Sequence, residues 1–543
     1  MNCLKMVQGR NPSGRVRPGF RLDIDPALVE RFQGYLTDES RMKGSADLVA
    51  FPESEAEVAQ TLGEASRLGA KVTVSAGRTG VVGGAVPLGG WGLSVEGMNQ
   101  VSDFSWDQES GEFRLKVGPG LPLDKIQRAI RSAHFPFSQP PDSRTEALLE
   151  EFRGQSTRWI FAPDPTETTA QIGGMVASNA SGARTFAFGS TRDHVRGLTI
   201  VLSDRTVLNL TRSACHNDNG LISIQRPDGS VIMVPQPSYR IPRTKHAAGY
   251  FTAPKLDPID LFIGSEGTLG VITEIEIALC RIDGQEAEVI AFFPDFLSGC
   301  RYVSAIRSHR ESAGFDIESI EYLCADSLAL LGKSMPAHGI SNRFPEDGSV
   351  AVFTGIRIKE DVAEALSTVG RFISESGGNF DESLAAYGPV DLARIKHARH
   401  AIPESINAMV AKIKEVHPKI TKLGTDMSVP DEFLTEVMQM YSRYLSEANL
   451  RFFIFGHIGN NHLHVNIIPR NPAEYDRGRS IYLDFARNVV GMGGSVSAEH
   501  GIGKLKKYLL ETQFSGKALD EMKRVKRAMD PSLMLGYGTL FEF

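Results

Sequence analysis

Two histidines and an asparagine recur at alternate positions of one short segment near the end of the chain. The segment is GHIGNNHLHVNII, residues 456–468, and from Asn461 its polar and apolar residues alternate. His462, His464 and Asn466 therefore point to one face of a strand. The opposite face is apolar and carries Leu463, Val465 and Ile467. A solvated polar face is the alternative, but the cluster favours a chemical site.

A second segment, SAEHGIGKLK at residues 497–506, places a carboxylate next to another imidazole. Glu499 and His500 stand beside a glycine turn, which can aim both side chains into a cavity. A carboxylate and two imidazoles are ligands that suit zinc, manganese or iron. Taken alone, this segment is also consistent with a surface loop.

Three glycine-dense blocks occur in the first half of the chain. They are AGRTGVVGGAVPLGG, IGGMVASNASGARTFAFGS and FIGSEGTLGVITEIEIAL, at residues 76–90, 172–190 and 262–279. Glycine lets backbone N–H groups approach a dinucleotide pyrophosphate and tolerates positive φ. One such block alone is equally consistent with tight turns.

The ordered series of blocks resembles the FAD-binding domain of the p-cresol methylhydroxylase and vanillyl-alcohol oxidase family, over residues 45–283. The matching motifs are SAGRTGVVGGAVP, FAPDPTETTAQIGGMVASNASG with the following FGSTRDHVRGLTIVLSD, and GSEGTLGVITE. The resemblance implies FAD contacts from two groups of residues. The first is the pyrophosphate loop, with Ala76, Gly77, Arg78, Thr79, Gly80, Gly83 and Gly84. The second lines the rest of the site, with Pro165, Gly173, Gly174, Ser178, Ser181, Gly182, Gly189 and Ile272.

The chain departs from this family at three points. Arg78 stands where the family usually has glycine, so its side chain must point away from the phosphates or pair with one. The loop holds no histidine or cysteine, where some members attach the flavin covalently, so we expect non-covalent FAD. Near the C-terminal end, LGYG replaces the family's asparagine-proline-glycine signature, with Gly536 in the place of the asparagine.

The two segments rich in histidine resemble the FAD-linked oxidase C-terminal domain, from residue 290 to the end. D-lactate dehydrogenases, D-2-hydroxyglutarate dehydrogenases and the flavin subunit of glycolate oxidase share this domain. The resemblance implies His500 as the catalytic base and three metal ligands: His457, His464 and Glu499. The family's usual Gly-Asp-Gly-Asn core is Gly-Asn-Asn-His here, at residues 459–462, which removes a carboxylate and adds an imidazole.

The substrate's carboxylate needs a cation in a dry pocket. RHAIPESIN and KITKLGTDMSVP, residues 399–407 and 419–430, resemble the segments that supply it. Our candidates for substrate contacts are Arg399, Lys422 and Asn466. Arg394 and Lys396 compete, because this helix is rich in basic residues, and a solvated basic face is the alternative.

The elements that position these motifs follow from hydrophobic periodicity. DLVAF and KVTVS, ending at Phe51 and Ser75, are strands that enclose a helix opened by Ser54 and ended by Gly69. Its apolar residues recur at helical spacing: Val58, Leu62, Ala65 and Leu68. The runs LTIVL and RTVLNL are further strands, and RPDGSVIMV indicates a hairpin. Beyond residue 286, strand and helix patterns alternate to about residue 470, with a long helix over 390–415.

We therefore predict an α+β chain with two domains. A two-subdomain FAD-binding domain is followed by an α+β substrate (cap) domain, whose C-terminal helical segment returns to the flavin. The predicted boundaries are a lead over residues 1–40, flexible at its start, the FAD-binding domain over 41–283, and the substrate and metal domain over 284–543.

Composition excludes several other classes of protein. The 543 residues carry 59 Lys and Arg against 65 Asp and Glu, a net charge of −6, so no basic surface for nucleic acid is expected. The 5 cysteines include no CxxC pair, which argues against a fused iron–sulfur module and fits a reducing compartment. The N-terminal segment has no long apolar run. We expect a cytoplasmic protein, with peripheral membrane contact left open.

These observations together favour FAD-dependent oxidation of a D-2-hydroxy acid of the D-lactate or D-2-hydroxyglutarate class to the 2-oxo acid. The hydride would pass to the flavin and the electrons to a separate acceptor: a quinone, a cytochrome or an electron-transfer protein. The expected cofactors are FAD and a divalent metal, zinc first, with manganese or iron as alternatives. A homodimer is left open. The rival functions are a glycolate oxidase-type flavin subunit, a flavin-binding subunit without chemistry, an oxygen-using oxidase, and a non-redox enzyme like alkyl-dihydroxyacetone-phosphate synthase.

Overall fold

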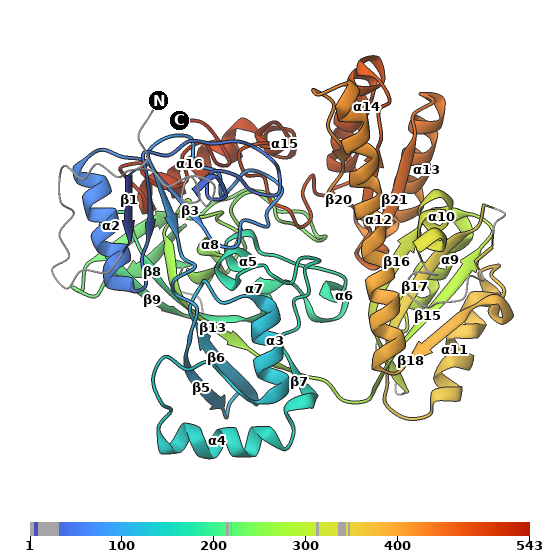
Figure 1. Cartoon of the computed structure of the whole chain (residues 1–543), viewed down its shortest axis with the longest axis horizontal. Helices are drawn as coiled ribbons and strands as arrows, with labels where there is room; N and C mark the ends of the chain where they lie inside the picture. The colour runs from blue at the N-terminus through green and yellow to red at the C-terminus, as the bar shows by residue number, and fades with distance from the viewer. Residues whose placement is uncertain are drawn as a thin grey trace.

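The chain folds into two α+β halves that lie side by side in the computed structural model (Figure 1). The structure describes residues 5–8, 32–212, 217–218, 220–310, 314–334, 344–345 and 348–543. The first half is coloured blue to green and the second half yellow to orange. The last segment, in red, lies against the first half, so the chain crosses between the halves twice.

A small parallel sheet begins the first half, in the order β1-β2-β4-β3. Its strands are β1 Lys5–Gln8, β2 Leu48–Phe51, β4 Trp91–Ser94 and β3 Val72–Ser75. The predicted strand-helix-strand is confirmed, with α2 Glu55–Arg67 between β2 and β3 and the Ser54 side chain capping its N-terminus. Leu68 is 58% exposed, because the helix ends one residue before it.

The predicted flexible start of the chain contains one ordered strand. Residues 5–8 pair in parallel with β2 as β1, because the edge of β2 offers unpaired backbone groups. The rest of the expected flexible start, residues 1–4 and 9–31, lies outside the described part of the chain.

A five-stranded antiparallel sheet carries the rest of the first half, in the order β5-β6-β13-β8-β9. Its strands are β5 Val101–Asp107, β6 Glu112–Val117, β13 Val271–Ala278, β8 Val195–Val201 and β9 Val207–Thr211. The predicted hairpin is confirmed as β11 Leu221–Gln225 with β12 Val231–Pro235, beside β10 Asn217–Asp218. Two short strands pair separately, β7 Trp159–Ile160 and β14 Cys280–Arg281. The helices are α3 Leu123–Ser132, α4 Ser143–Arg153, α5 Ile172–Ser178, α6 Thr185–Phe188, α7 Thr191–His194 and α8 Ile259–Phe262.

The second half is built on one larger sheet in the order β18-β15-β17-β16-β21-β22-β19, with β20 also paired to β22. The strands are β15 Gln285–Phe293, β16 Phe315–Leu323, β17 Val350–Ile358, β18 Leu384–Tyr387, β19 Leu423–Gly424, β20 Met427–Ser428, β21 Phe452–Gly456 and β22 His462–Ile467. The helices are α9 Phe296–Arg307, α10 Ala325–Ser334, α11 Val362–Glu375, α12 Pro389–Val416, α13 Leu434–Glu447 and α14 Pro472–Gly491. The long helix predicted over 390–415 is α12, and the strands of the alternating pattern beyond residue 286 include β15 and β17, which contain VIAFF and VAVFTGI.

The C-terminal helical segment returns to the flavin-binding half, as predicted. It contains α15 Lys507–Gln513 and α16 Gly516–Met529. The buried Lys526 ammonium donates to the carbonyl oxygens of Thr268 at 2.6 Å and Leu535 at 2.9 Å, and the N–H of Gly536 donates to Val72 at 2.8 Å. The end of the chain thus becomes part of the first half. Among the helices of the described residues, none has the length and apolar character needed to cross a membrane.

Candidate active site

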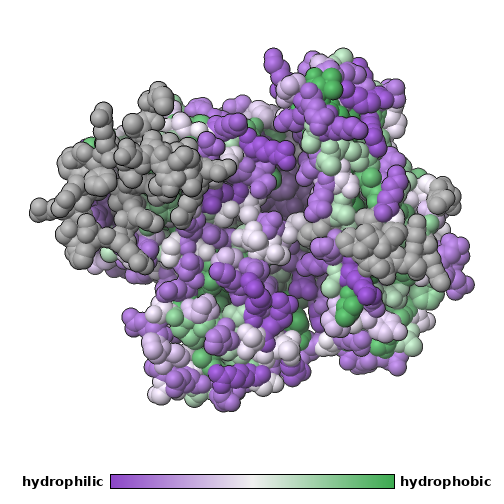
Figure 2. Space-filling model, viewed as in Figure 1, coloured by the Kyte–Doolittle hydropathy of each residue, from purple (hydrophilic) through white to green (hydrophobic). Residues whose placement is uncertain are grey.

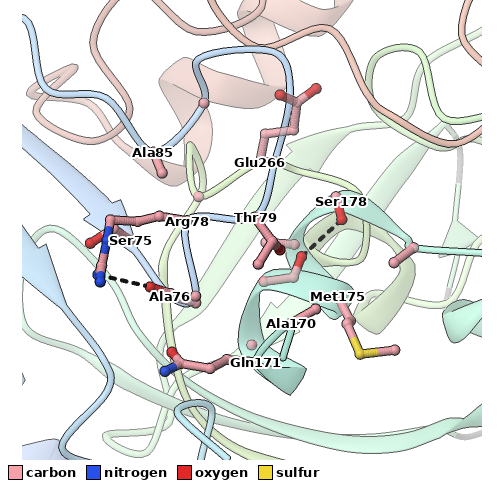
Figure 3. A pocket seen from close by; sticks show the side chains of 18 of the residues that line it. Ser75, Ala76, Arg78, Thr79, Ala85, Ala170, Gln171, Met175, Ser178 and Glu266 are labelled. Carbon is pink, nitrogen blue, oxygen red and sulfur yellow. Dashed lines mark hydrogen bonds between the residues drawn. The ribbon is translucent and has the colours of Figure 1, made fainter. Parts of the chain in front are cut away.

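A cavity of about 350 Å³ lies among the glycine blocks of the first half. Its size falls within the range of small-molecule and cofactor sites. Many of the predicted FAD contacts line it: Ala76, Gly77, Arg78, Thr79, Gly80, Gly84, Pro165, Gly173, Gly174, Ser178, Ser181 and Ile272. Figure 3 shows Thr79 and Ser178 on facing segments, with the Ser178 hydroxyl bonded to the backbone of its own helix. The cavity also reaches Glu499 and His500 of the second half.

Three predicted FAD contacts do not line this cavity, and packing explains their glycines. A Cβ on Gly182 would lie 2.1 Å from the Asp164 carbonyl oxygen. Gly189 has a φ of +80° and lies against the Asp193 carboxylate. Gly83 has a φ of +75° and lies behind the loop, against Met42. Their assignment to FAD remains a prediction.

Arg78 points its side chain toward the N-terminal segment. Its φ of +56° is one that glycine adopts readily, which accounts for the glycine usual at this position. The guanidinium lies 4.0 Å from the centre of the Tyr35 ring and 3.8 Å from the Glu96 carboxylate. The positive charge of Arg78 is therefore stabilised by a cation–π contact with Tyr35 and by the Glu96 carboxylate.

Buried polar atoms in the cavity wall support its use by a polar cofactor. Ser181 Oγ and Gln171 Oε1 line the cavity and have no hydrogen-bond partner among the residues that the structure describes. Buried polar groups rarely stay unpaired in a native protein. The ribityl, ribose and pyrophosphate groups of FAD offer partners of this kind, so the residues present fit the cofactor. Gln171 was missed from the sequence, although it directly precedes a glycine block.

Glu266 joins the flavin-binding half to the loop that carries His500. Its carboxylate accepts the N–H groups of Ile502 at 2.8 Å and Gly503 at 2.7 Å. Burial raises the pKa of Glu266 to about 7. Lys504 adds a second link, because its ammonium donates to the Gly84 carbonyl at 2.9 Å. Loop 497–506 is thus fixed against the pyrophosphate loop, a connection that the sequence did not reveal.

The three predicted metal ligands come together at the end of this cavity. Glu499 lies 3.5 Å from His457 Nε2 and 3.3 Å from His464 Nε2. The opposite ring nitrogens face oxygen atoms: His457 Nδ1 lies 2.7 Å from Glu321, and His464 Nδ1 lies 3.1 Å from the Thr425 carbonyl. Metal-bound histidines usually have such partners on the other nitrogen. The donor set therefore fits a divalent metal.

The carboxylate of Glu321 changes the protonation of His457. Burial alone would lower the pKa of His457, but the nearby carboxylates of Glu321 and Glu499 outweigh it and raise that pKa to about 9. A proton on Nε2 of His457 would compete with a metal for that atom. The proton on Nδ1 would not, because it donates to Glu321 on the other side of the ring. Glu321 lies far from either motif in the sequence, so the sequence pattern could not reveal it.

Asp426 organises the loop around His500. This fully buried carboxylate accepts the N–H groups of Glu499 at 3.1 Å and His500 at 3.0 Å and the Ser497 hydroxyl at 2.6 Å. It also lies 3.3 Å from His500 Nδ1. Burial lowers the pKa of His500 to about 4, so its imidazole is neutral near pH 7. Asp426 lies in the quoted stretch KLGTDMSVP, but nothing in its local pattern assigned it a role.

Two further side chains in this cluster were not predicted as ligands or partners. Lys245, 3% exposed, lies with its ammonium 2.7 Å from the Glu499 carboxylate. His462 is fully buried, which excludes the solvated polar face considered for this strand. A second possible cation position uses Asp426, Glu499 and His500. Asp426 already accepts three hydrogen bonds, so the histidine cluster is the better site.

The three candidates for substrate contacts are each engaged with the protein and do not line the cavity. Arg399 on α12 pairs with Glu288 at 2.9 Å. Lys422 donates to the Asn407 side chain at 3.2 Å, and Asn466 donates to the His464 carbonyl at 3.1 Å. Of their competitors, Arg394 pairs with Asp391, whereas Lys396 has no ion pair within 4.0 Å in the described residues. The substrate assignments remain predictions.

Comparisons with known proteins match both halves. Residues 285–539 match the family of FAD linked oxidases, C-terminal domain, and residues 46–148 and 154–211 match the FAD binding domain. The chain is 26% identical to a D-2-hydroxyglutarate dehydrogenase of Xanthomonas citri pv. viticola, over 97% of this chain and 95% of that protein. It is 25% identical to a D-lactate dehydrogenase of Anaerostipes hadrus, over 95% and 98% of the two chains. A solved alkyldihydroxyacetonephosphate synthase shares the fold, with a TM-score of 0.58 and 14% identity over 95% of this chain and 82% of that one.

Proposed function

This chain belongs to the family of FAD-linked oxidases, and from that premise we propose that it oxidises a D-2-hydroxy acid to the 2-oxo acid. The substrate class is D-lactate or D-2-hydroxyglutarate, which are the substrates named for two relatives that match along nearly the whole chain. FAD would be held non-covalently by residues of the glycine blocks that line the cavity, and it would supply the hydride acceptor for the substrate's Cα.

One observation carries the proposal: the flavin cavity and the histidine–carboxylate cluster form one continuous site. Glu499 and His500 line the cavity, and the same Glu499 lies within 3.5 Å of two metal-ligand candidates. A small substrate bound there contacts both the flavin and the cluster. That is the arrangement that oxidation of an alcohol carbon requires.

We assign the roles of the residues from their surroundings. His500 removes the hydroxyl proton, because its imidazole is neutral and lines the cavity. Asp426 holds the Nδ1 side of that ring, which leaves Nε2 for the substrate. His457, His464 and Glu499 would hold a divalent metal, which would supply Lewis-acid chemistry by lowering the pKa of a bound hydroxyl. Loop 497–506, fixed by Glu266, holds Glu499 and His500 at the cavity wall.

The finer assignments belong to the same proposal. Zinc is the first candidate for the metal, with manganese or iron as alternatives. The electrons leave for a separate acceptor, namely a quinone, a cytochrome or an electron-transfer protein. We propose a cytoplasmic location and leave a homodimer open. Arg399 and Lys422 reach the substrate's carboxylate only if they exchange their present partners, Glu288 and Asn407.

The test is an anaerobic screen in which D- and L-2-hydroxy acids are mixed with the FAD-loaded enzyme. Bleaching of the flavin absorbance by D-lactate or D-2-hydroxyglutarate, and not by the L-acids, is the expected result. Bleaching by glycolate with a preference over both would favour a glycolate oxidase-type subunit. If no 2-hydroxy acid bleaches the flavin, the proposal is wrong. A non-redox reaction, as in the enzyme whose fold the chain shares, would then be the next candidate.

A further inference from the structure

His462 lies inside the histidine cluster rather than at its edge. Its ring centre is 5.3 Å from that of His457 and 4.5 Å from that of His464. Its Nδ1 atom lies 3.8 Å from the Glu499 carboxylate. One donor atom from each of these three histidines and Glu499 lies within 4.8 Å of the others. A single cation can therefore reach all four residues.

His462 is oriented in the same way as the two predicted histidine ligands. Its Nε2 atom, on the side away from Glu499, lies 3.1 Å from the Asp426 carboxylate. His457 has Glu321 in this position and His464 has the Thr425 carbonyl. An oxygen behind a ring nitrogen favours the N–H there and leaves the lone pair on the other nitrogen. In all three rings that lone pair points toward Glu499.

Burial gives an independent reason for a ligand at His462. The side chain is fully buried, and within the described part of the chain its Nδ1 atom has no hydrogen-bond partner. Buried polar groups rarely remain unsatisfied. A cation beside Glu499 would bind the Nδ1 lone pair of His462 and so give this buried nitrogen a partner.

We propose that His462 is a fourth protein ligand, so that the site holds a divalent transition metal through three imidazoles and one carboxylate. The ligand atoms are His457 Nε2, His464 Nε2, His462 Nδ1 and a Glu499 oxygen. The inference rests on the proposed function for its substrate. A 2-hydroxy acid offers two oxygens, which brings the ligands to six. Imidazole and carboxylate ligands suit zinc, iron and manganese, so this set fits each of the metals proposed above.

Lys245 is the competing cation in this cluster. Its ammonium lies 2.7 Å from the Glu499 carboxylate and 3.4 Å from the Gly182 carbonyl. A metal bound by all four ligands requires this ammonium to move away from Glu499. If Lys245 instead neutralises Glu499 permanently, the cluster takes up no metal.

Metal affinity tests the proposal without relying on activity. The full-length, FAD-loaded enzyme is treated with a chelator and titrated with Zn²⁺ alone and with Mn²⁺ alone. Loss of an outer partner of a ligand typically costs about 10–100-fold in metal affinity, so loss of a ligand should cost at least about 100-fold. His462→Asn should show this loss for both ions. His134→Asn, at an exposed histidine, is the matched control and should bind as the wild type does. Unchanged flavin absorbance shows that His462→Asn is folded.

X-ray absorption of the zinc-loaded wild type gives a readout that needs no variant. Three imidazoles per zinc are expected, and two in His462→Asn. Three results would each overturn the inference. They are two imidazoles per zinc in the wild type, an unchanged metal affinity in His462→Asn, and no ion bound by the wild type at millimolar metal concentration. The proposed function is refuted by a different result. If the enzyme binds metal through His462 but no 2-hydroxy acid bleaches its flavin, the metal site is supported and the proposed substrate class is wrong.

Discussion

Replacing Asp426 with asparagine keeps the size of the side chain and removes its charge. Each of its two oxygens accepts a backbone N–H, from Glu499 at 3.1 Å and from His500 at 3.0 Å. Asparagine has only one acceptor oxygen. Whichever way the amide is turned, its NH₂ group faces one of these two donors, and one buried N–H loses its partner.

The size of the effect follows from these contacts. A hydrogen bond to a charged group is worth about 1.5–3 kcal/mol, and an unsatisfied buried donor costs about 1–3 kcal/mol. Asp426→Asn should therefore lower the free energy of unfolding by about 2.5–6 kcal/mol, against a total of about 5–15 kcal/mol for a typical domain. The loop shifts, and His500 loses the carboxylate 3.3 Å from its Nδ1 atom. General base catalysis contributes about 10²–10⁴-fold, so flavin reduction should slow at least 100-fold.

Stopped-flow flavin reduction by the best substrate measures this, well below the melting temperature of the variant. The flavin absorbance shows whether FAD is still bound. Asp484→Asn is the matched control, because Asp484 pairs with Arg487 on the exposed face of α14. The control should reduce its flavin at the wild-type rate. An Asp426→Asn enzyme that holds FAD and reduces it within a few-fold of the wild type would refute the role given to Asp426.

Three further predictions concern the cofactor and the loop. Acid precipitation should release FAD into the supernatant, and a yellow pellet over a colourless supernatant would contradict non-covalent binding. His500→Ala should keep its metal, as measured by elemental analysis, and should reduce its flavin at least about 100-fold more slowly. Glu499→Ala should lose the metal and bind substrate weakly. A full metal content in Glu499→Ala would refute the assignment of Glu499 as a ligand. Because burial lowers the pKa of His500 to about 4, the base is active above that pH and protonated below it. The wild-type reduction rate should therefore stay level from pH 8 to about pH 6 and fall only in more acidic buffer, and a fall centred near pH 7 would contradict the assignment.

Local patterns were sufficient to predict the parts of the site that lie close together in the sequence. The alternation over 462–467 places His462 and His464 side by side on β22, and the glycine blocks mark the walls of the cavity. The strand-helix-strand around α2 followed from periodicity in the same way. In each case, the residues that act together belong to one element or one turn.

The remaining parts of the site depend on contacts between distant segments. Glu321 and Lys245 lie outside the quoted motifs, and Asp426 and Glu266 lie inside them, but no spacing in the sequence assigns a role to any of the four. Their roles appear only when the sheet of the second half meets the cavity of the first. Conversely, the basic character of Arg399 suggested a free cation, but the structure pairs it with Glu288 on the neighbouring strand β15. Residue type alone does not show whether a charge is already neutralised.

The attachment of the C-terminal segment to the first half has a consequence for how the protein matures in the cell. Lys71 donates to the carbonyl of Leu533, which lies 462 positions later, at 2.9 Å, and the N–H of Gly536 donates to the carbonyl of Val72, the first residue of β3. Translation runs from the N-terminus, so the pyrophosphate loop leaves the ribosome long before the residues that complete its surroundings. The first half is therefore completed only after residues 533–536 have been made, and a chain that stops before them lacks these contacts to Lys71 and Val72.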